Sequence, residues 1–134
     1  MSKTERKDES RSEYQAKSQL ESIREMVAAL EAAGDDDTAR EEAEQTIHED
    51  PLSVEVRGDW YQPGSKAEKP CRYRILLCWG GPACRIIGDL DQYGQPETAE
   101  IEHQDWRIPW TELHTSNEDE KVLLTYARCF YFEQ

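Results

Sequence analysis

The chain has 134 residues, enough for one compact domain with an additional helical segment. Its 29 acidic and 16 basic residues give a net charge of −13, which argues against direct binding to nucleic acid or to anionic membranes. No stretch approaches the roughly 20 apolar residues of a membrane span, and the polar N-terminus lacks the apolar segment of a secretory signal. We therefore expect a cytoplasmic protein with reduced cysteines.

The N-terminal part is expected to be a tail followed by a long amphipathic helix. Residues 1–12 are polar, with charges of nearly balanced sign, and are expected to be disordered. From Glu13 onward apolar side chains recur at helical spacing, and Gly34 suits the position just after a helix. Heptad spacing predicts a homodimer seam formed by Leu20, Ile23, Val27 and Leu30. Packing on the sheet or on a partner is the alternative, because such a helix cannot bury its apolar face alone.

A second, shorter helix is expected over residues 39–48, with Thr38 and Glu41 as its capping box and Pro51 as its stop. The helical segment, residues 13–50, is strongly acidic. We expect eight of its carboxylates to form a partner-binding surface: Asp35, Asp36, Asp37, Glu41, Glu42, Glu44, Glu49 and Asp50. Two simpler reasons for the acids remain open. Acids near a helix N-terminus complement the helix dipole, and negative charge keeps a protein soluble.

After Pro51 the apolar period changes from that of a helix to that of a strand, which predicts a sheet domain over residues 51–134. An antiparallel meander of about four strands is expected within residues 52–58, 73–79, 83–90 and 98–106. The next segment contains Pro109 and is expected to be an edge strand or irregular. A C-terminal helix, capped by Ser116 with Asp119, is expected to cover the sheet, with a final strand as the alternative. The predicted fold class is α+β, with an acidic helical hairpin before the meander.

Neither a metal nor a cofactor is expected. The spacing of Cys71, Cys78, Cys84 and Cys129 lacks the short Cys-x-x-Cys pairs of a structural zinc site. Gly80-Gly81-Pro82 matches no phosphate-binding motif and predicts a tight turn between two strands. That turn would place Cys78 opposite Cys84 and Leu76 opposite Ile86. The two thiols would then be close enough to crosslink under mild oxidation.

Acidic and histidine side chains of one predicted strand are the candidates for acid–base chemistry. Strand alternation places His103 on the same face as Ile101, which is typical of a core histidine, and Glu100 and Glu102 on the other. No nucleophile motif accompanies them, so an enzyme is not expected. Aromatic residues form cores as well as interaction surfaces. We expect Trp106 to be core and leave Trp110 open between the two roles.

Four segments carry a resemblance to a known group of proteins: IREMVAALEA, EDPLSVEVR, RILLCWGGPACRIIGDLDQYGQP and IEHQDWRIPWTEL. Together they resemble a family of small accessory proteins of bacterial phages and mobile elements, from about Ser22 to the end of the chain. The resemblance implies a genetic setting, and hence the cytoplasm of a host cell, but no enzyme motif and no functional residue.

Small acidic proteins in that setting are often anti-defence factors, such as anti-CRISPR or anti-restriction proteins. By this analogy, the acidic surface would block the basic nucleic-acid-binding groove of a host defence protein, as a DNA mimic does. The alternative is a dimeric scaffold or regulatory module without nucleic-acid mimicry.

Overall fold

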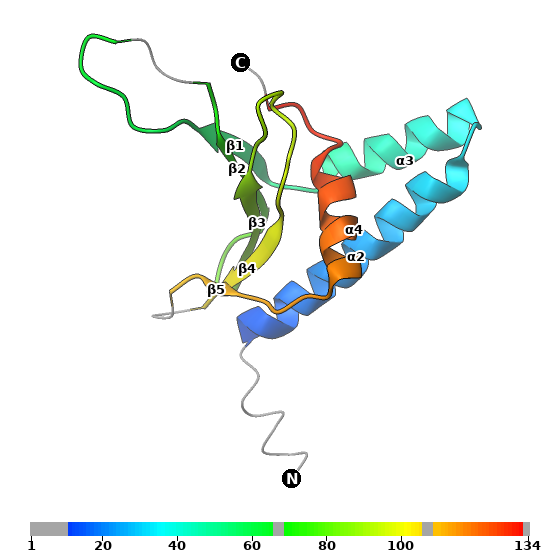
Figure 1. Cartoon of the computed structure of the whole chain (residues 1–134). Coiled ribbons are helices and arrows are strands. Elements are labelled where there is room, and N and C mark those ends of the chain that lie inside the picture. Colours follow the sequence, from blue (N-terminus) through cyan, green and yellow to red (C-terminus); the bar gives the residue numbers. More distant parts are fainter. Residues whose placement is uncertain (1–10, 66–68, 106–108, 133–134) are drawn as a thin grey trace.

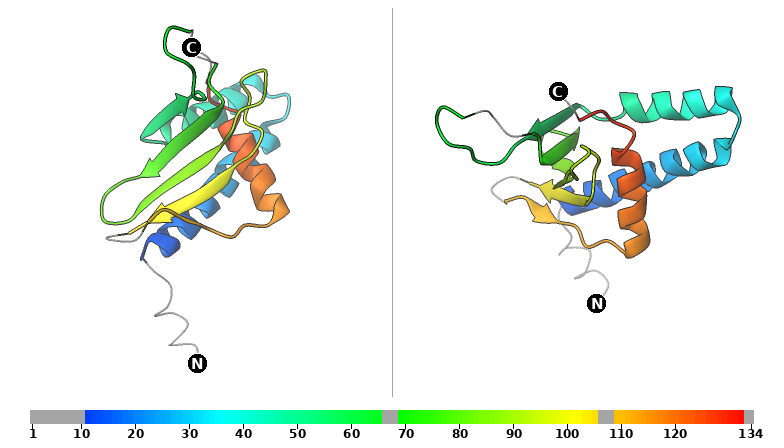
Figure 2. Two further views of the ribbon diagram at one scale, coloured as in Figure 1. Left: turned by 60° about the vertical axis from the view of Figure 1, so that its left-hand side comes forward. Right: turned by 45° about the horizontal axis from the view of Figure 1, so that its top comes forward.

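The protein is a sheet with helices on one side (Figure 1). The computed structural model describes residues 11–65, 69–105 and 109–132. Its elements are, in chain order, α2 (Arg11–Ala33), α3 (Asp37–Glu49), β1 (Ser53–Arg57), β2 (Arg72–Cys78), β3 (Ala83–Asp89), β4 (Glu100–Gln104), β5 (Thr111–Glu112) and α4 (Asn117–Ala127). The five strands form one antiparallel sheet in sequential order. Helices α2 and α4 pack against one face, and no described element covers the other (Figure 2). The predicted α+β class, with its meander and covering helix, is confirmed.

Helix α2 begins at Arg11, two residues before the predicted start. Ser12 is fully buried, and its Oγ lies 2.9 Å from Nδ1 of the buried His103 on β4. Ser12 therefore belongs to the folded core and not to the tail that was predicted for residues 1–12. The other end of the helix agrees with the prediction, because Gly34 follows it with a φ of +52°. Of the predicted tail, residues 1–10 lie outside the described residues.

Helix α3 has a different N-cap from the one predicted. The N-cap is Asp36, whose side chain accepts a hydrogen bond of 3.2 Å from the backbone N–H of Ala39. Thr38 lies inside the helix, so the predicted capping box of Thr38 and Glu41 is wrong. Asp is at least as favourable as Thr at this position. Asp36 also precedes Thr38 in the chain, so α3 begins at Asp37, two residues before the predicted start.

The predicted dimer seam lies inside the molecule. Its four side chains are almost fully buried within the single chain: Leu20, Ile23, Val27 and Leu30. They belong to one hydrophobic cluster with Ile86 and Ile101 of the sheet and with Leu123 of α4. The apolar face of α2 is therefore covered by the protein's own sheet together with α3 and α4. A dimer through this seam is replaced by intramolecular packing, and the helical segment and the sheet share one core.

The β2–β3 register agrees with the prediction at Cys78 and Cys84 and differs beyond them. Cys78 lies opposite Cys84, but an irregularity between Leu76 and Cys78 then shifts the pairing by one residue, so Leu76 lies opposite Arg85. A regular ladder would have turned the even-numbered side chains of β2, Arg74 among them, toward the core. The bulge keeps Tyr73, Ile75 and Leu77 inside and the arginines of β2 outside.

The paired cysteines support a test of this register. The neighbouring Cys78 thiol and burial together hold the pKa of Cys84 well above its usual range. We expect diamide, a two-electron oxidant, to accept the two thiol hydrogens and leave an S–S bond. The tryptic peptide over residues 75–85, which contains both cysteines, should then lose the mass of two hydrogen atoms. The C78S variant is the control. Alkylation of both thiols after oxidation would refute the register.

The C-terminal part confirms the predicted helix and adds a fifth strand. Strand β5 lies just after Pro109 and pairs with β4, so this segment is an edge strand, the first of its two predicted alternatives. Helix α4 begins with the predicted capping box, in which Ser116 and Asp119 bond reciprocally. The helix ends at Ala127, so the aromatic end of the chain is neither helix nor strand. There Phe132 is buried, with its ring centroid 5.0 Å from that of Tyr73.

Asp119 also joins α4 to α2, through hydrogen bonds of 3.0 and 2.6 Å from the Arg24 guanidinium. Burial raises the pKa of Asp119, but the hydrogen bonds from Arg24 and Ser116 outweigh it, so the pKa lies below its usual value. A lowered folded-state pKa means that the carboxylate contributes stability above its unfolded pKa. This contribution is lost as pH falls through the folded pKa.

We expect D119A to lower the free energy of unfolding at pH 7 by about 1 kcal/mol, with a smaller difference from wild type below about pH 4. Urea denaturation at pH 7 and at pH 3 measures both quantities. E118A, in the same first turn but without the Arg24 contact, is the matched control. A deficit of D119A that stays constant between the two pH values would contradict this role of the carboxylate.

Candidate functional site

Helices α2 and α3 form a hairpin whose closed end extends past the sheet (Figures 1 and 2). Helix α2 has 23 residues and is about 35 Å long, more than any strand of the sheet. The first part of α2 packs on the strands, and its last part packs on α3. From residue 31 to residue 42 no side chain is buried, and α3 buries only Ala43 and Ile47. The closed end therefore contributes little to the core.

Half of the eight predicted carboxylates have partners within the protein. Asp36 caps α3, and Glu44 forms an ion pair of 3.2 Å with Arg40. Glu49 accepts a hydrogen bond of 2.7 Å from the Gln45 amide. Asp50 accepts one of 2.6 Å from the Tyr126 hydroxyl. Burial, and then this bond to Asp50, raises the pKa of Tyr126 well above its usual range. These four side chains stabilise the hairpin and its attachment to α4.

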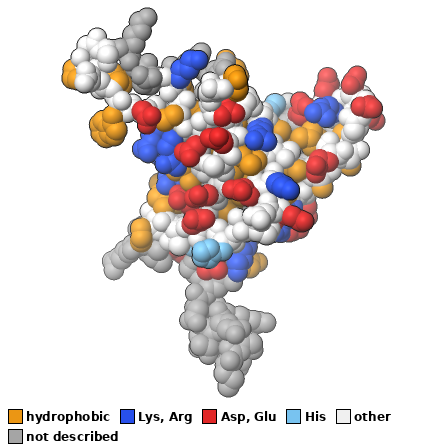
Figure 3. All heavy atoms as spheres, in the orientation of Figure 1, with side chains coloured by type: hydrophobic (Ala, Val, Ile, Leu, Met, Phe, Trp, Pro, Cys, Tyr) orange, Lys and Arg blue, Asp and Glu red, His pale blue; other side chains and the backbone are white. Residues whose placement is uncertain are grey.

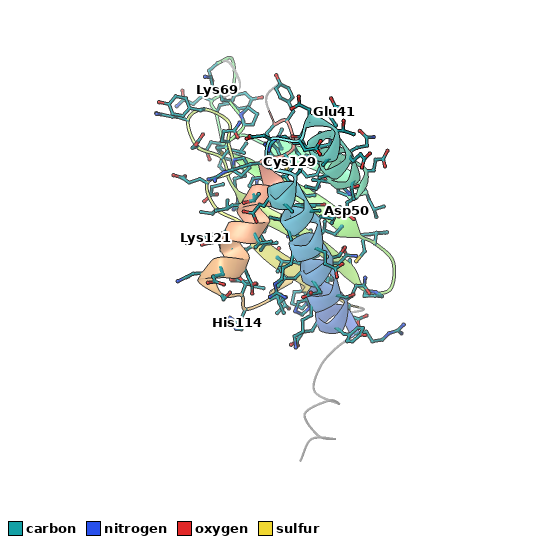
Figure 4. All side chains as sticks on the ribbon, turned by 90° about the vertical axis from the view of Figure 1, so that its right-hand side faces the viewer. Glu41, Asp50, Lys69, His114, Lys121 and Cys129 are labelled. Carbon is teal, nitrogen blue, oxygen red and sulfur yellow. The ribbon has the colours of Figure 1, made fainter. Side chains whose placement is uncertain are left out.

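The other four lie at or near the closed end: Asp35, Asp37, Glu41 and Glu42. We call them the tip carboxylates. All four are exposed, and their side chains make no hydrogen bond or ion pair with a described residue. Figure 3 shows acidic side chains gathered at this end of the molecule, and Figure 4 looks onto it, with Glu41 labelled. They remain available for a partner.

The histidine of β4 has a structural environment. His103 is 6% exposed and shares the core face of the strand with Ile101, as predicted. Its hydrogen-bond partner Ser12 is fully buried. The strand places Glu100 and Glu102 on the face of the sheet opposite to His103, again as predicted.

The uncovered face of the sheet holds a set of residues that the sequence analysis did not single out. Four arginines line a hollow of about 420 Å³ there: Arg57, Arg72, Arg74 and Arg85. Each alternates with apolar residues in its strand. This alternation was the available signal that they share a face. We call this surface the arginine face.

Two tryptophans lie outside the buried core. Trp60, in the loop between β1 and β2, is fully exposed, with Tyr61 beside it. Trp110 is half-buried, and the Arg85 guanidinium lies 4.0 Å from its ring centroid as a cation–π contact. Trp110 therefore supports the sheet surface from its edge rather than filling the core. Trp106, predicted to be core, lies outside the described residues.

Comparisons of this chain with protein-family models, with curated proteins and with solved structures find no match. In the part of the chain that the structure describes, no three His, Cys, Asp or Glu side chains form a group that could hold a metal ion. None of the described helices is long and apolar enough to cross a membrane.

Proposed function

We propose that this protein is a non-enzymatic binding protein whose tip carboxylates engage a basic surface of a partner protein. The observation that carries the proposal is the hairpin end itself, which is exposed, unpaired and acidic beyond what the fold requires. Carboxylates bind arginine through short charge-assisted hydrogen bonds, and a concentrated negative charge also accelerates association with a basic surface.

The hairpin is suited to present these charges in a fixed arrangement. Ala43 and Ile47 anchor α3 on α2, and the hydrogen bond from Tyr126 to Asp50 ties the end of α3 to α4. Asp37 and Glu41 are four residues apart on α3, which places their side chains about 5–6 Å apart on one helix face. A preordered array loses less entropy on binding than a flexible acidic tail would.

The partner that this charge suits is a host protein with a groove built for nucleic acid. The protein would then act as an inhibitor in the manner of a DNA mimic. The phage-like setting suggests an anti-defence role, of which anti-CRISPR activity is one form. The residues of the predicted α2 seam are buried within the chain, which argues against the alternative of a scaffold that dimerises through α2.

Charge reversal at the tip tests the proposal. We expect D35K/E41K/E42K to lose at least tenfold in affinity for the partner, because attractive charges become repulsive. The matched control is E25K/E97K/E118K, which changes three exposed acids elsewhere and brings the net charge from −13 to the same −7. Pulldowns from bacterial lysate at 50 and 500 mM NaCl compare wild type with both variants. Circular dichroism verifies that all three are folded.

A supporting partner is captured by wild type and by the control variant, is lost with the tip variant, and is weakened at high salt. DNA should compete with the protein for this partner if the groove is the target. A partner that binds all three proteins equally at both salt concentrations would exclude the tip carboxylates as the binding surface. A partner that binds DNA and this protein at the same time would exclude the mimic mechanism.

A further inference from the structure

The sheet register aligns the side chains of the arginine face in rows across the strands. Residues directly opposite on neighbouring strands lie on the same face, about 5 Å apart, and successive rows lie about 7 Å apart along the strands. The first row is Arg57, Arg72 and Asp89; the second is Glu55, Arg74, Ile87 and Glu100; the third is Ser53, Leu76, Arg85, Glu102 and Glu112. The arginines occupy β1 to β3, and acids dominate β4 and β5.

The cations of this face are incompletely neutralised. Three of the four arginines have one carboxylate partner each: Arg72 with Asp89 at 3.3 Å, Arg74 with Glu55 at 2.7 Å and Arg85 with Glu102 at 2.9 Å. The Arg57 guanidinium makes no hydrogen bond or ion pair with a described residue, and it lies opposite Arg72. Like charges directly opposite each other on a sheet are destabilising. The pair therefore persists at an energetic cost that a bound anion would offset.

Arg72 has an unused donor at the same place. Its Nε is shielded from solvent and, although 3.3 Å from Asp89 Oδ1, it makes no aligned hydrogen bond. A shielded donor without an acceptor is unfavourable. Each guanidinium carries five N–H donors, so the one-carboxylate pairs at Arg74 and Arg85 also leave donors free. Donors from four arginines thus converge on one hollow.

We propose that this hollow binds a small molecule carrying linked phosphate groups, such as a diphosphate. Guanidinium groups match phosphate oxygens in geometry, and the volume of about 420 Å³ lies in the range of small-ligand sites. Arginines in adjacent rows, about 7 Å apart, would contact successive phosphates of one ligand. Ile87 lies in the middle of the face, between Arg74 and Glu100, as an apolar floor.

The acidic half of the face favours a small ligand over a long nucleic acid. Glu100, Glu102 and Glu112 lie on the next two strands, and among the described residues only Glu102 has an arginine partner. Burial, and then the charges of Glu112 and Glu102, raises the pKa of Glu100. A polyanion running across the sheet would meet them, whereas a ligand confined to β1–β3 would not.

Titration with pyrophosphate tests the site. We expect pyrophosphate to bind the full chain more tightly than inorganic phosphate, and ¹H–¹⁵N NMR shifts to be confined to β1–β3. R57Q/R72Q should weaken pyrophosphate binding by about tenfold or more. The control R40Q/K121Q removes two cations from the helices and should bind like wild type. Thermal unfolding verifies that both variants fold.

Four results would overturn the proposal. The first two are no binding at millimolar pyrophosphate and NMR shifts outside β1–β3. The third is an equal loss of pyrophosphate affinity in the two double variants. The fourth is a wild-type dimer that R57Q/R72Q dissociates, which would mean that a second copy covers the face. Oligonucleotides whose affinity grows with length would instead indicate a nucleic-acid surface. The tip variant D35K/E41K/E42K should bind pyrophosphate as wild type does, so this site and the proposed partner-binding function fail or succeed separately.

Discussion

Replacing Ile23 by alanine is expected to lower the free energy of unfolding by about 2–5 kcal/mol. Ile23 is fully buried on α2, in the cluster that includes side chains of the sheet and of α4. Alanine would remove three buried carbon atoms and leave a cavity that close-packed neighbours fill only in part. Urea denaturation monitored by tryptophan fluorescence measures the change.

The same variant distinguishes intramolecular packing from the dimer seam predicted from the heptad spacing. E25A, an exposed change on the same helix, should alter stability by no more than about 0.5 kcal/mol. The melting temperature of wild type should not depend on protein concentration, because the core of one chain buries Ile23. A melting temperature that rises with concentration in wild type, and loses this dependence in I23A, would show that α2 packs between two copies.

Gly88→Ala is expected to cost about 3 kcal/mol, although the substitution adds only one carbon atom. A Cβ at this position would overlap the Thr98 carbonyl oxygen and would lie 2.9 Å from Cε1 of Tyr73. The Thr98 backbone can relieve this overlap only if the segment before β4 moves. That movement would disturb the 2.6 Å hydrogen bond from the Tyr73 hydroxyl to the same carbonyl. Overpacking of this kind destabilises by about 1–3 kcal/mol, and a backbone clash lies at the upper end.

Gly64→Ala separates crowding from backbone conformation. Gly64 has a φ of +86°, but nothing lies within 4 Å of a Cβ built there. Alanine at Gly64 should therefore cost only the strain of the left-handed conformation, about 1–2 kcal/mol. Thermal denaturation of both variants gives the comparison. If Gly88→Ala lowered the melting temperature less than Gly64→Ala does, the backbone of Thr98 could not lie as close to Gly88 of β3 as the structure places it.

Local patterns in the sequence were sufficient for the elements of the fold. Apolar spacing indicates α2 and the alternating strands because each element must turn one face to the core. The same alternation places His103 inside, opposite the outward face of Glu100 and Glu102. The turn at Gly80 predicts that Cys78 lies opposite Cys84. These features depend on neighbours within a few residues, which a single sequence displays.

Choices between two arrangements that are both acceptable locally were not predictable in this way, because the rest of the fold decides between them. Asp36 and Thr38 are both acceptable N-caps, and the β2 bulge depends on whether Arg74 or Ile75 faces the core.

For the candidate sites, composition and charge were enough to indicate an acidic hairpin. The fold separated its carboxylates into those with internal partners, such as Asp50, and the exposed tip carboxylates. It also covered the heptad seam with the sheet, α3 and α4, and it aligned four arginines from three strands around one hollow. The difference has a physical cause. Periodicity and charge are local properties of a chain, whereas burial, pairing and the convergence of side chains depend on which surfaces meet when it folds.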